Sequence, residues 1–155
     1  MAESLTQSMH ALILPTSRVP MLVPSTMTAE IMGVPKISPL PFSEPWVLGV
    51  IGWRKRAIPV VSFEILLGDR VPPVMHPRSK VVVFQPLQGH NEWDFFGLLV
   101  SADPQPYTIS DTKDLSPSET PINNPVVGAT VTIGRTAVVI PDMEALQRIM
   151  YPGSR

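Results

Sequence analysis

Residues 49–68 read GVIGWRKRAIPVVSFEILLG and contain two short apolar runs, Gly49–Trp53 and Ala57–Leu67, on either side of a basic tripeptide. Both runs are rich in valine and isoleucine, and the polar break between them, Arg54–Arg56, has the length of a hairpin loop. Short β-branched runs separated in this way are typical of two antiparallel strands. We therefore expect a β-hairpin at the centre of the chain.

The second run has one face that is apolar along its whole length, made of alternate residues: Ala57, Pro59, Val61, Phe63 and Ile65. The other face begins with Ile58 and Val60 and turns polar at Ser62 and Glu64. One buried and one partly buried face fit a barrel wall beside a surface groove. Because Pro59 cannot donate a ladder hydrogen bond, we expect this strand at a sheet edge, at a bulge, or paired through its other groups.

The composition indicates a folded protein with many short strands. The 155 residues suffice for one well-buried domain or two small, closely packed halves. The 19 prolines are more than twice the usual share, charged residues are scarce at 16%, and hydrophobic residues reach 44%, which excludes disorder. A net charge of −1 provides no general attraction for nucleic acid or an anionic membrane.

The sequence shows neither the pattern of a signal peptide nor that of a membrane span. There is no cysteine, so disulfide and thiolate chemistry are excluded. The first 15 residues, MAESLTQSMHALILP, lack the basic start and the long apolar region of a signal peptide. No apolar run approaches the length of a membrane span. We expect a cytoplasmic protein.

Apolar runs predict further strands, and proline-rich or polar segments predict the connections between them. The expected strands cover residues 10–15, 19–24, 80–84, 94–101, 126–133 and 136–140. The expected connections cover residues 34–45, 69–77 and the polar loop 110–124. A short helix is expected at Ala29–Gly33, with Thr26 or Thr28 as its cap. Gly134-Arg135 favours a type II′ turn.

A second helix is expected at Asp142–Met150, because apolar residues recur there at helical spacing: Met143, Leu146, Ile149 and Met150. We expect residues 1–8 to form a flexible tail and residues 9–155 to form one domain.

Residues 29–68 resemble the coupling proteins of bacterial chemosensory systems, the CheW family. That family shows a Glu-Ile pair, a proline-containing connection, Gly-Val-x-Asn-x-Arg-Gly, a Pro-Val strand and a Leu-Gly ending. The matching residues here are Glu30-Ile31, Gly49-Val50, Arg54, Pro59-Val60 and Leu67-Gly68. Weaker similarity in residues 12–23, 97–100 and 127–150 extends the resemblance over most of the chain.

Three residues depart from the family pattern. Gly52 stands where the family usually has Asn, Lys55 where it has Gly, and Ser62 where it has Asp. Lysine is disfavoured at positive φ, so we expect a different turn geometry after Arg54. The departures suggest a divergent or accessory member, of the ChpC type that serves type IV pilus (twitching) chemosensory systems.

The resemblance implies an all-β fold of two intertwined, five-stranded antiparallel β-barrels, SH3-like, with a few short helices including a C-terminal one. It implies a non-catalytic adaptor without cofactor or metal. One partner would be the regulatory domain of a CheA-like histidine kinase, and the other would be the cytoplasmic tip of a methyl-accepting chemoreceptor. By position, the implied partner-binding residues are Thr28, Glu30, Gly49 and Arg54.

Glu30 and Arg54 are also implied to form an ion pair that stabilises the fold; the alternative is two unrelated surface charges. Breaking a partly buried pair at one residue would cost about 3–5 kcal/mol. An exposed pair would contribute less than about 1 kcal/mol. We expect strong destabilisation by either single substitution, and a double substitution that costs less than their sum.

Other chemistry finds little support in the residues. There is no Gly-x-Ser-x-Gly elbow and no glycine-rich phosphate loop, and the histidines, His10, His76 and His90, are far apart in sequence. We expect no catalysis and no metal site. The basic tripeptide beside Trp53 permits an alternative, a small β-barrel that binds nucleic acid. A scaffold for a pilus or regulatory protein is a further alternative.

Overall fold

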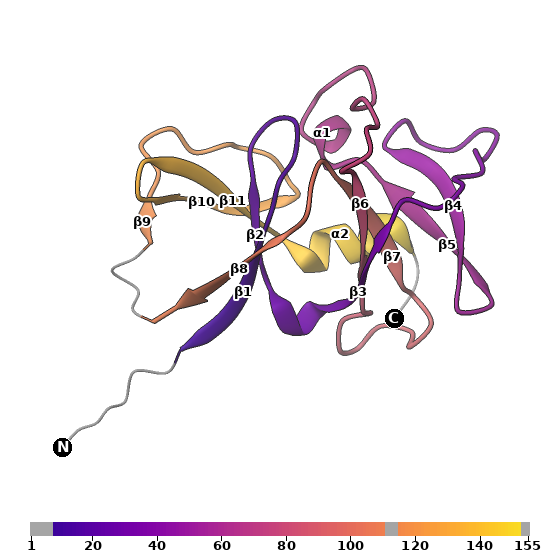
Figure 1. The fold of residues 1–155 in the computed structure, drawn as a ribbon, viewed down its shortest axis with the longest axis horizontal. Coiled ribbons are helices and arrows are strands. Elements are labelled where there is room, and N and C mark those ends of the chain that lie inside the picture. Colours follow the sequence, from indigo (N-terminus) through magenta and orange to yellow (C-terminus); the bar gives the residue numbers. More distant parts are fainter. Residues whose placement is uncertain (1–7, 111–114, 153–155) are drawn as a thin grey trace.

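The computed structural model describes residues 8–110 and 115–152, and its strands form two sheets (Figure 1). Sheet A has six strands in the order β8-β1-β2-β11-β10-β9, and sheet B has five in the order β3-β6-β7-β5-β4. Sheet A consists of β1 (Met9–Leu14), β2 (Met21–Pro24), β8 (Gln105–Ile109), β9 (Ser116–Pro117), β10 (Val127–Ile133) and β11 (Thr136–Pro141). Sheet B consists of β3 (Thr28–Gly33), β4 (Val47–Trp53), β5 (Arg56–Val61), β6 (Lys80–Phe84) and β7 (Phe96–Val100). The expected mainly β fold is confirmed.

The two sheets are intertwined along the chain, because the middle of the chain builds sheet B and both ends build sheet A. Each sheet contains one parallel pair among antiparallel ones. In sheet A, β2 runs parallel to β11 with Met21 opposite Val139. In sheet B, β5 runs parallel to β7 with Val60 opposite Gly97. The sheets are therefore mixed, although the ladders predicted from hairpins are antiparallel.

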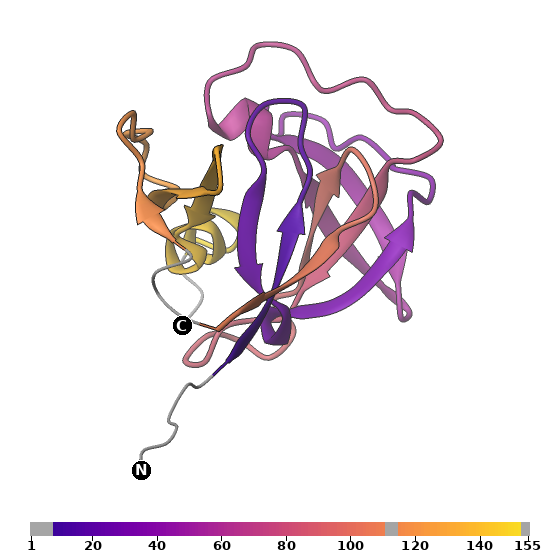
Figure 2. The same cartoon turned by 60° about the vertical axis from the view of Figure 1, so that its left-hand side comes forward.

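The main hydrophobic core lies between the two sheets, and β1–β2 stand between the C-terminal strands and sheet B (Figures 1 and 2). Strands β6 and β7 of sheet B are buried on both faces. Val82 and Phe84 of β6 point into this shared core, whereas Val81 and Val83 point into a second cluster on the other face. Burial on both faces explains why Val81–Phe84 and Phe96–Val100 are unbroken apolar runs rather than alternating ones.

Helix α2 (Met143–Met150) closes the shared core, as the sequence predicts. Asp142 caps it by accepting a hydrogen bond from the Ala145 N–H at 3.0 Å. Buried Gln147 donates from Nε2 to the Asp94 carbonyl at 2.9 Å. The Tyr151 hydroxyl donates to the Phe95 carbonyl. The contacts of Gln147 and Tyr151 attach α2 and the residue after it to the connection between β6 and β7.

The predicted helix at Ala29–Gly33 is wrong, because this segment forms β3. Only a 3₁₀ turn, η1 (Ser25–Met27), precedes it. A helix of five residues gains few internal hydrogen bonds. As a strand, the same segment pairs with β6 from Thr28 to Gly33. Long-range pairing therefore overrides the local helix signal.

The predicted strand Ala57–Leu67 is correct only as far as Val61. Ser62 then caps the short helix α1 (Phe63–Leu66), and its Oγ accepts from the Ile65 N–H at 3.3 Å. The expected face assignment is also wrong at the start of the run, where Ala57 is exposed. Serine placed before an apolar run was an available helix-start signal.

Pro59 lies inside sheet B rather than at its edge. Of the three expected possibilities, the one that applies is pairing of the strand through its other groups. β5 has β4 on one side and β7 on the other. Opposite Pro59, the backbone N–H and C=O of Val50 bond instead to Ser38, each at 2.9 Å. The parallel ladder with β7 begins at Val60. No ladder bond from Pro59 to β4 is therefore required.

Sequence reasoning missed β8 because of its prolines. β8 is an edge strand of sheet A, where a missing N–H is tolerated, and Pro106 lies opposite Leu12 of β1. The expected loop 110–124 contains the two-residue strand β9, and its residues 111–114 lie outside the described part of the chain. The predicted tail, residues 1–8, also falls outside the description except at Ser8.

Candidate partner-binding site

The β4–β5 turn presents Arg54 and Lys55 at the tip of a hairpin in sheet B. Both residues have positive φ, +47° and +65°, and Trp53 pairs with Arg56 below them. Positive φ at both turn positions is the type I′ pattern, which normally selects Asn or Gly. Lys55 thus adopts the left-handed conformation that glycine would adopt there at lower cost.

Glu30, Trp53 and Arg54 form a cluster beside this turn. The Trp53 Nε1–H donates to Glu30 Oε1 at 3.0 Å, and Arg54 Nη2 lies 3.5 Å from the same oxygen. The guanidinium carbon of Arg54 is 4.3 Å from the centre of the Trp53 ring. Trp53 is 5% exposed and packs in the core cluster of sheet B. A buried indole therefore anchors two charged side chains.

The exposure of the ion pair sets its energetic weight. The Arg54 and Glu30 side chains are 60% and 42% exposed. An exposed pair contributes less than about 1 kcal/mol, so the strong destabilisation expected for a partly buried pair does not apply here. Glu30 has a second role as the acceptor for the Trp53 N–H. Glu30 is therefore worth more to the fold than Arg54.

Gly49 lies beneath the connection between β3 and β4. Its φ is +149°, and a Cβ at this position would lie 2.4 Å from the Ser38 carbonyl oxygen. No side chain larger than hydrogen fits without a shift of the backbone. Gly49 therefore allows the backbone of Ser38 to pack closely against β4.

Thr28 is the first residue of β3, the strand that carries Glu30. Its Oγ1 donates to the Ser25 carbonyl at 2.7 Å, which ties the start of β3 to η1. Of the four residues implied by resemblance, the structure joins Glu30 and Arg54 directly. Thr28 shares a strand with Glu30, and Gly49 shares a strand with Trp53.

A second arginine–tryptophan contact lies beside the first, and sequence reasoning did not include its tryptophan. The Arg56 guanidinium carbon is 3.5 Å from the centre of the Trp93 ring, and Trp93 is 56% exposed. The Trp53 ring also packs against Phe95, with ring centres 4.8 Å apart. We call Glu30, Trp53, Arg54, Arg56 and Trp93 the arginine–tryptophan surface. Trp93 lies about 40 residues from its partner, so only folding reveals the contact.

The histidines do not assemble into a site. Across residues 8–110 and 115–152, no group of three or more His, Cys, Asp or Glu side chains could hold a metal ion. His90 contacts Glu144 through its Nε2 and joins the β6–β7 connection to α2. No helix in the described part of the chain is long and apolar enough to cross a membrane.

Among the described residues, the strands form two β-sheets, and the arginine–tryptophan surface lies beside the β4–β5 turn. The CheW-like domain family model matches residues 14–149, so the chain belongs to that family. The crystal structure of the scaffolding protein TtCheW from Thermoanaerobacter tengcongensis is similar, with a TM-score of 0.70 at 16% identity. The match covers 88% of this chain and 90% of that one. No curated protein sequence matches the chain significantly.

Family membership decides the general activity. CheW-like proteins are non-catalytic scaffolds that couple receptors to a CheA kinase in chemosensory signalling. The chain is therefore an adaptor of this kind, and the expected absence of catalysis agrees with its family.

Proposed function

We propose that this adaptor binds its partners through a site that includes Thr28, Glu30, Gly49 and Arg54. The observation that carries the proposal is the cluster in which buried Trp53 anchors Glu30 and Arg54 at the surface. A charged residue that is prepositioned in this way loses little side-chain entropy when a partner binds. The exposed Arg54 keeps donors for carboxylate or carbonyl oxygens of a partner.

The two partners in this proposal are the regulatory domain of a CheA-like histidine kinase and the cytoplasmic tip of a methyl-accepting chemoreceptor. Residues 9–155 would act as one CheW-like domain of two β-barrel subdomains, in the cytoplasm and without inserting into the membrane. The departures at Gly52, Lys55 and Ser62 support an accessory role. We assign that role to a type IV pilus (twitching) system of the ChpC type.

The proposal is tested by a pull-down from lysate with the purified protein, read by mass spectrometry. We expect recovery of a chemosensory histidine kinase or a chemoreceptor, and less of it with Arg54→Glu. The matched control is Arg135→Glu, because Arg135 is an exposed arginine in the turn of the other hairpin, β10–β11. Equal recovery with both variants would contradict the assigned site. Recovery of only a pilus or regulatory protein would favour the other scaffold function.

Nucleic-acid binding is the second candidate, and the two arginine–tryptophan contacts favour it, since aromatic rings and arginines both bind single strands. Fluorescence anisotropy with a labelled single-stranded oligonucleotide separates the candidates. The adaptor function predicts no binding at physiological salt. Binding that weakens steeply with salt and is lost in Arg56→Glu would replace the adaptor site by a nucleic-acid site.

A further inference from the structure

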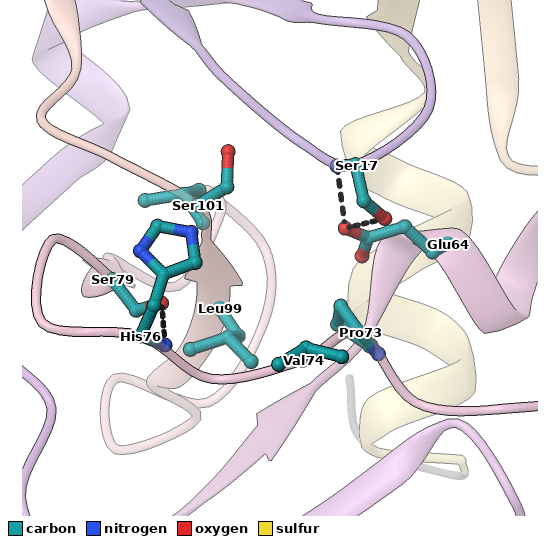
Figure 3. Close-up of a pocket in the computed structure, with 9 residues that line it drawn as sticks. Ser17, Glu64, Pro73, Val74, His76, Ser79, Leu99 and Ser101 are labelled. Atoms are coloured by element: carbon teal, nitrogen blue, oxygen red, sulfur yellow. Dashed lines mark hydrogen bonds between the residues drawn. The ribbon is translucent and has the colours of Figure 1, made fainter.

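A cavity of about 310 Å³ lies where the β1–β2 loop meets α1 and the end of β7. It is thus at the junction of the two sheets. In Figure 1, α1 and the β1–β2 loop lie at the top of the molecule, whereas β4 and β5 lie at its right-hand end. Figure 3 shows Ser17 and Glu64 on one side of the cavity, and His76, Ser79 and Ser101 on the other. None of the four partner-binding residues lines it.

Glu64 is the charged group at the cavity wall and is only 2% exposed. Its Oε2 accepts from the backbone N–H and the Oγ–H of Ser17, both at 3.0 Å (Figure 3). Among the described residues, its Oε1 accepts one hydrogen bond, from the Ser62 hydroxyl at 3.2 Å. A carboxylate has about four acceptor positions, so Oε1 retains acceptor capacity.

No basic side chain among the described residues forms an ion pair with Glu64. Arg18 follows Ser17 in the chain, but its guanidinium is bound to Asp69 at 3.3 Å and to the Leu67 carbonyl at 3.0 Å. His76 lines the same cavity without pairing with Glu64. A buried carboxylate held only by hydroxyl and amide donors lacks the opposite charge that usually accompanies such burial.

The remaining cavity wall is mainly apolar, formed by Pro73, Val74, Leu99 and Val100. Apolar walls suit an aliphatic stem and do not suit a hydrated metal ion. The described residues also supply too few ligands there for a metal. The cavity thus suits a cation on a short hydrocarbon chain, with the cation at the Glu64 carboxylate and the chain against the apolar wall.

We propose that this cavity binds an organic cation, a primary ammonium or guanidinium group on a short aliphatic stem, with Glu64 as its charge partner. Ser101 stands on the opposite side and its hydroxyl accepts from a remaining N–H group, whereas the Ser79 Oγ already accepts from the His76 backbone N–H at 3.1 Å (Figure 3). The cation comes either from a free amine or from a lysine or arginine side chain of a bound protein. The proposal is independent of the adaptor site at the β4–β5 turn.

The test is an NMR titration of the full chain with n-butylguanidinium, with n-butanol as the uncharged probe of similar shape. We expect saturable shifts of the Ser17 and Ser101 amide signals with the cation and none with the alcohol. Glu64→Gln keeps the side-chain shape and removes the charge, and it should weaken binding about tenfold or more. Absence of saturable shifts, or equal shifts in Glu64→Gln, would overturn the proposal.

A second variant supplies the cation from the chain itself. Val74 lines the cavity and is 84% exposed, so Val74→Lys should fold normally and place an ammonium group at the site. It should abolish n-butylguanidinium binding. Val71→Lys is the matched control, since Val71 is exposed on the same loop and does not line the cavity. Equal binding by both lysine variants would count against the site.

The two sources of the cation are separated by repeating the titration on the complex with a partner protein. Loss of probe binding in the complex assigns the cavity to a basic side chain of that partner. Retained binding assigns it to a free amine. If no partner is recovered, the titration of the isolated chain still decides whether the cavity binds cations, so failure of the two proposals can be distinguished.

Discussion

Glu64 and Glu30 are both held by hydrogen bonds, but they lie in regions with opposite surroundings. Glu64 is at the sheet junction, by which we mean the contact of α1 with the β1–β2 loop, and it is 2% exposed with no cation. Glu30 is on the arginine–tryptophan surface, where its side chain is 42% exposed and lies beside Arg54. Glu30, although it has an ion pair, therefore contributes less to the stability of the fold than Glu64.

The difference teaches that burial, rather than the presence of an ion pair, sets the energetic weight of a charge. At the junction, removal of the Glu64 carboxylate leaves the fully buried Ser62 hydroxyl without its acceptor, and an unpaired buried donor is costly. At the exposed surface, water replaces a lost partner and the cost is small. The Glu64 carboxylate at the junction therefore contributes more to the stability of the fold than the Glu30 carboxylate on the arginine–tryptophan surface.

The largest effect is expected for Phe63→Ala at the junction. Phe63 is fully buried in the shared core, so its truncation should cost about 3–5 kcal/mol in the free energy of unfolding. Urea denaturation measures this. Trp93→Ala is the matched control from the arginine–tryptophan surface and should cost less than about 1 kcal/mol, because its ring is half exposed. Similar losses of stability in Phe63→Ala and Trp93→Ala would contradict the difference in stability contribution between the junction and the arginine–tryptophan surface.

Glu64→Ala should cost about 1–3 kcal/mol, because it leaves the fully buried Ser62 hydroxyl without its acceptor and also removes the acceptor of the Ser17 amide. Thermal unfolding in the same buffer provides the measurement. Glu44→Ala serves as control, since Glu44 is exposed and its removal should change stability by less than about 0.5 kcal/mol. A stability of Glu64→Ala equal to the unmodified protein would show that the junction does not depend on this carboxylate.

Tyr151 follows α2, and its hydroxyl donates to the carbonyl of Phe95, whose ring packs on Trp53 of the arginine–tryptophan surface. Tyr151→Phe should cost about 1–1.5 kcal/mol. Burial, together with the charge of Asp94, raises the pKa of Tyr151 from 10.0 to about 12. The neutral hydroxyl therefore stabilises the fold below pH about 10, and this contribution is lost as the pH rises to about 12. Equilibrium unfolding at a series of alkaline pH values should show that loss in the unmodified protein and not in Tyr151→Phe.

A double-mutant cycle at Glu30 and Arg54 tests the exposed pair. Glu30→Ala should cost about 1 kcal/mol, since it also removes the acceptor of the Trp53 N–H, and Arg54→Ala should cost about 0.5 kcal/mol. Their coupling energy should be below about 1 kcal/mol and should decrease with added salt. A coupling energy of several kcal/mol that does not change with salt would show that this pair stabilises the fold as strongly as the buried Glu64 does.

The smallest effect concerns the backbone of the two hairpin turns. Lys55→Gly should stabilise the protein by about 0.5 kcal/mol, because Lys55 has positive φ and glycine adopts that conformation without a steric penalty. Gly134→Lys is the reverse change in the β10–β11 turn, where φ is +63°, and should destabilise by about 1 kcal/mol. Thermal midpoints that move in the same direction would refute the turn assignment.

Sequence patterns were sufficient where local and long-range preferences agree. Lys80–Phe84 was predicted with its observed bounds, because a β-branched run with both faces buried has no competing local structure. The C-terminal helix was recognised from the helical spacing of its apolar residues. In contrast, Ala29–Gly33 was read as a helix, since the strand β6 that decides its conformation lies about 50 residues away.

The candidate site was predictable only in part, for the same reason. Glu30 and Arg54 came from a resemblance to a family, and the basic tripeptide that carries Arg54 was visible in the sequence. The roles of Trp53 and Trp93 in holding the arginines depend on ring positions that the order of residues does not reveal. Glu64 was read as part of a polar strand face, whereas it is buried in a helix.

By itself, the sequence determined the mainly β class, the central and C-terminal hairpins, the closing helix and the family to which the chain belongs. These features depend on local periodicity, turn residues and ordered motifs, which are all written along the chain. The tertiary structure alone decided the parallel pair within each sheet, the conformation of Thr28–Gly33 and the cavity at Glu64. Each of these depends on contacts between distant segments, and burial at such contacts outweighs local preference.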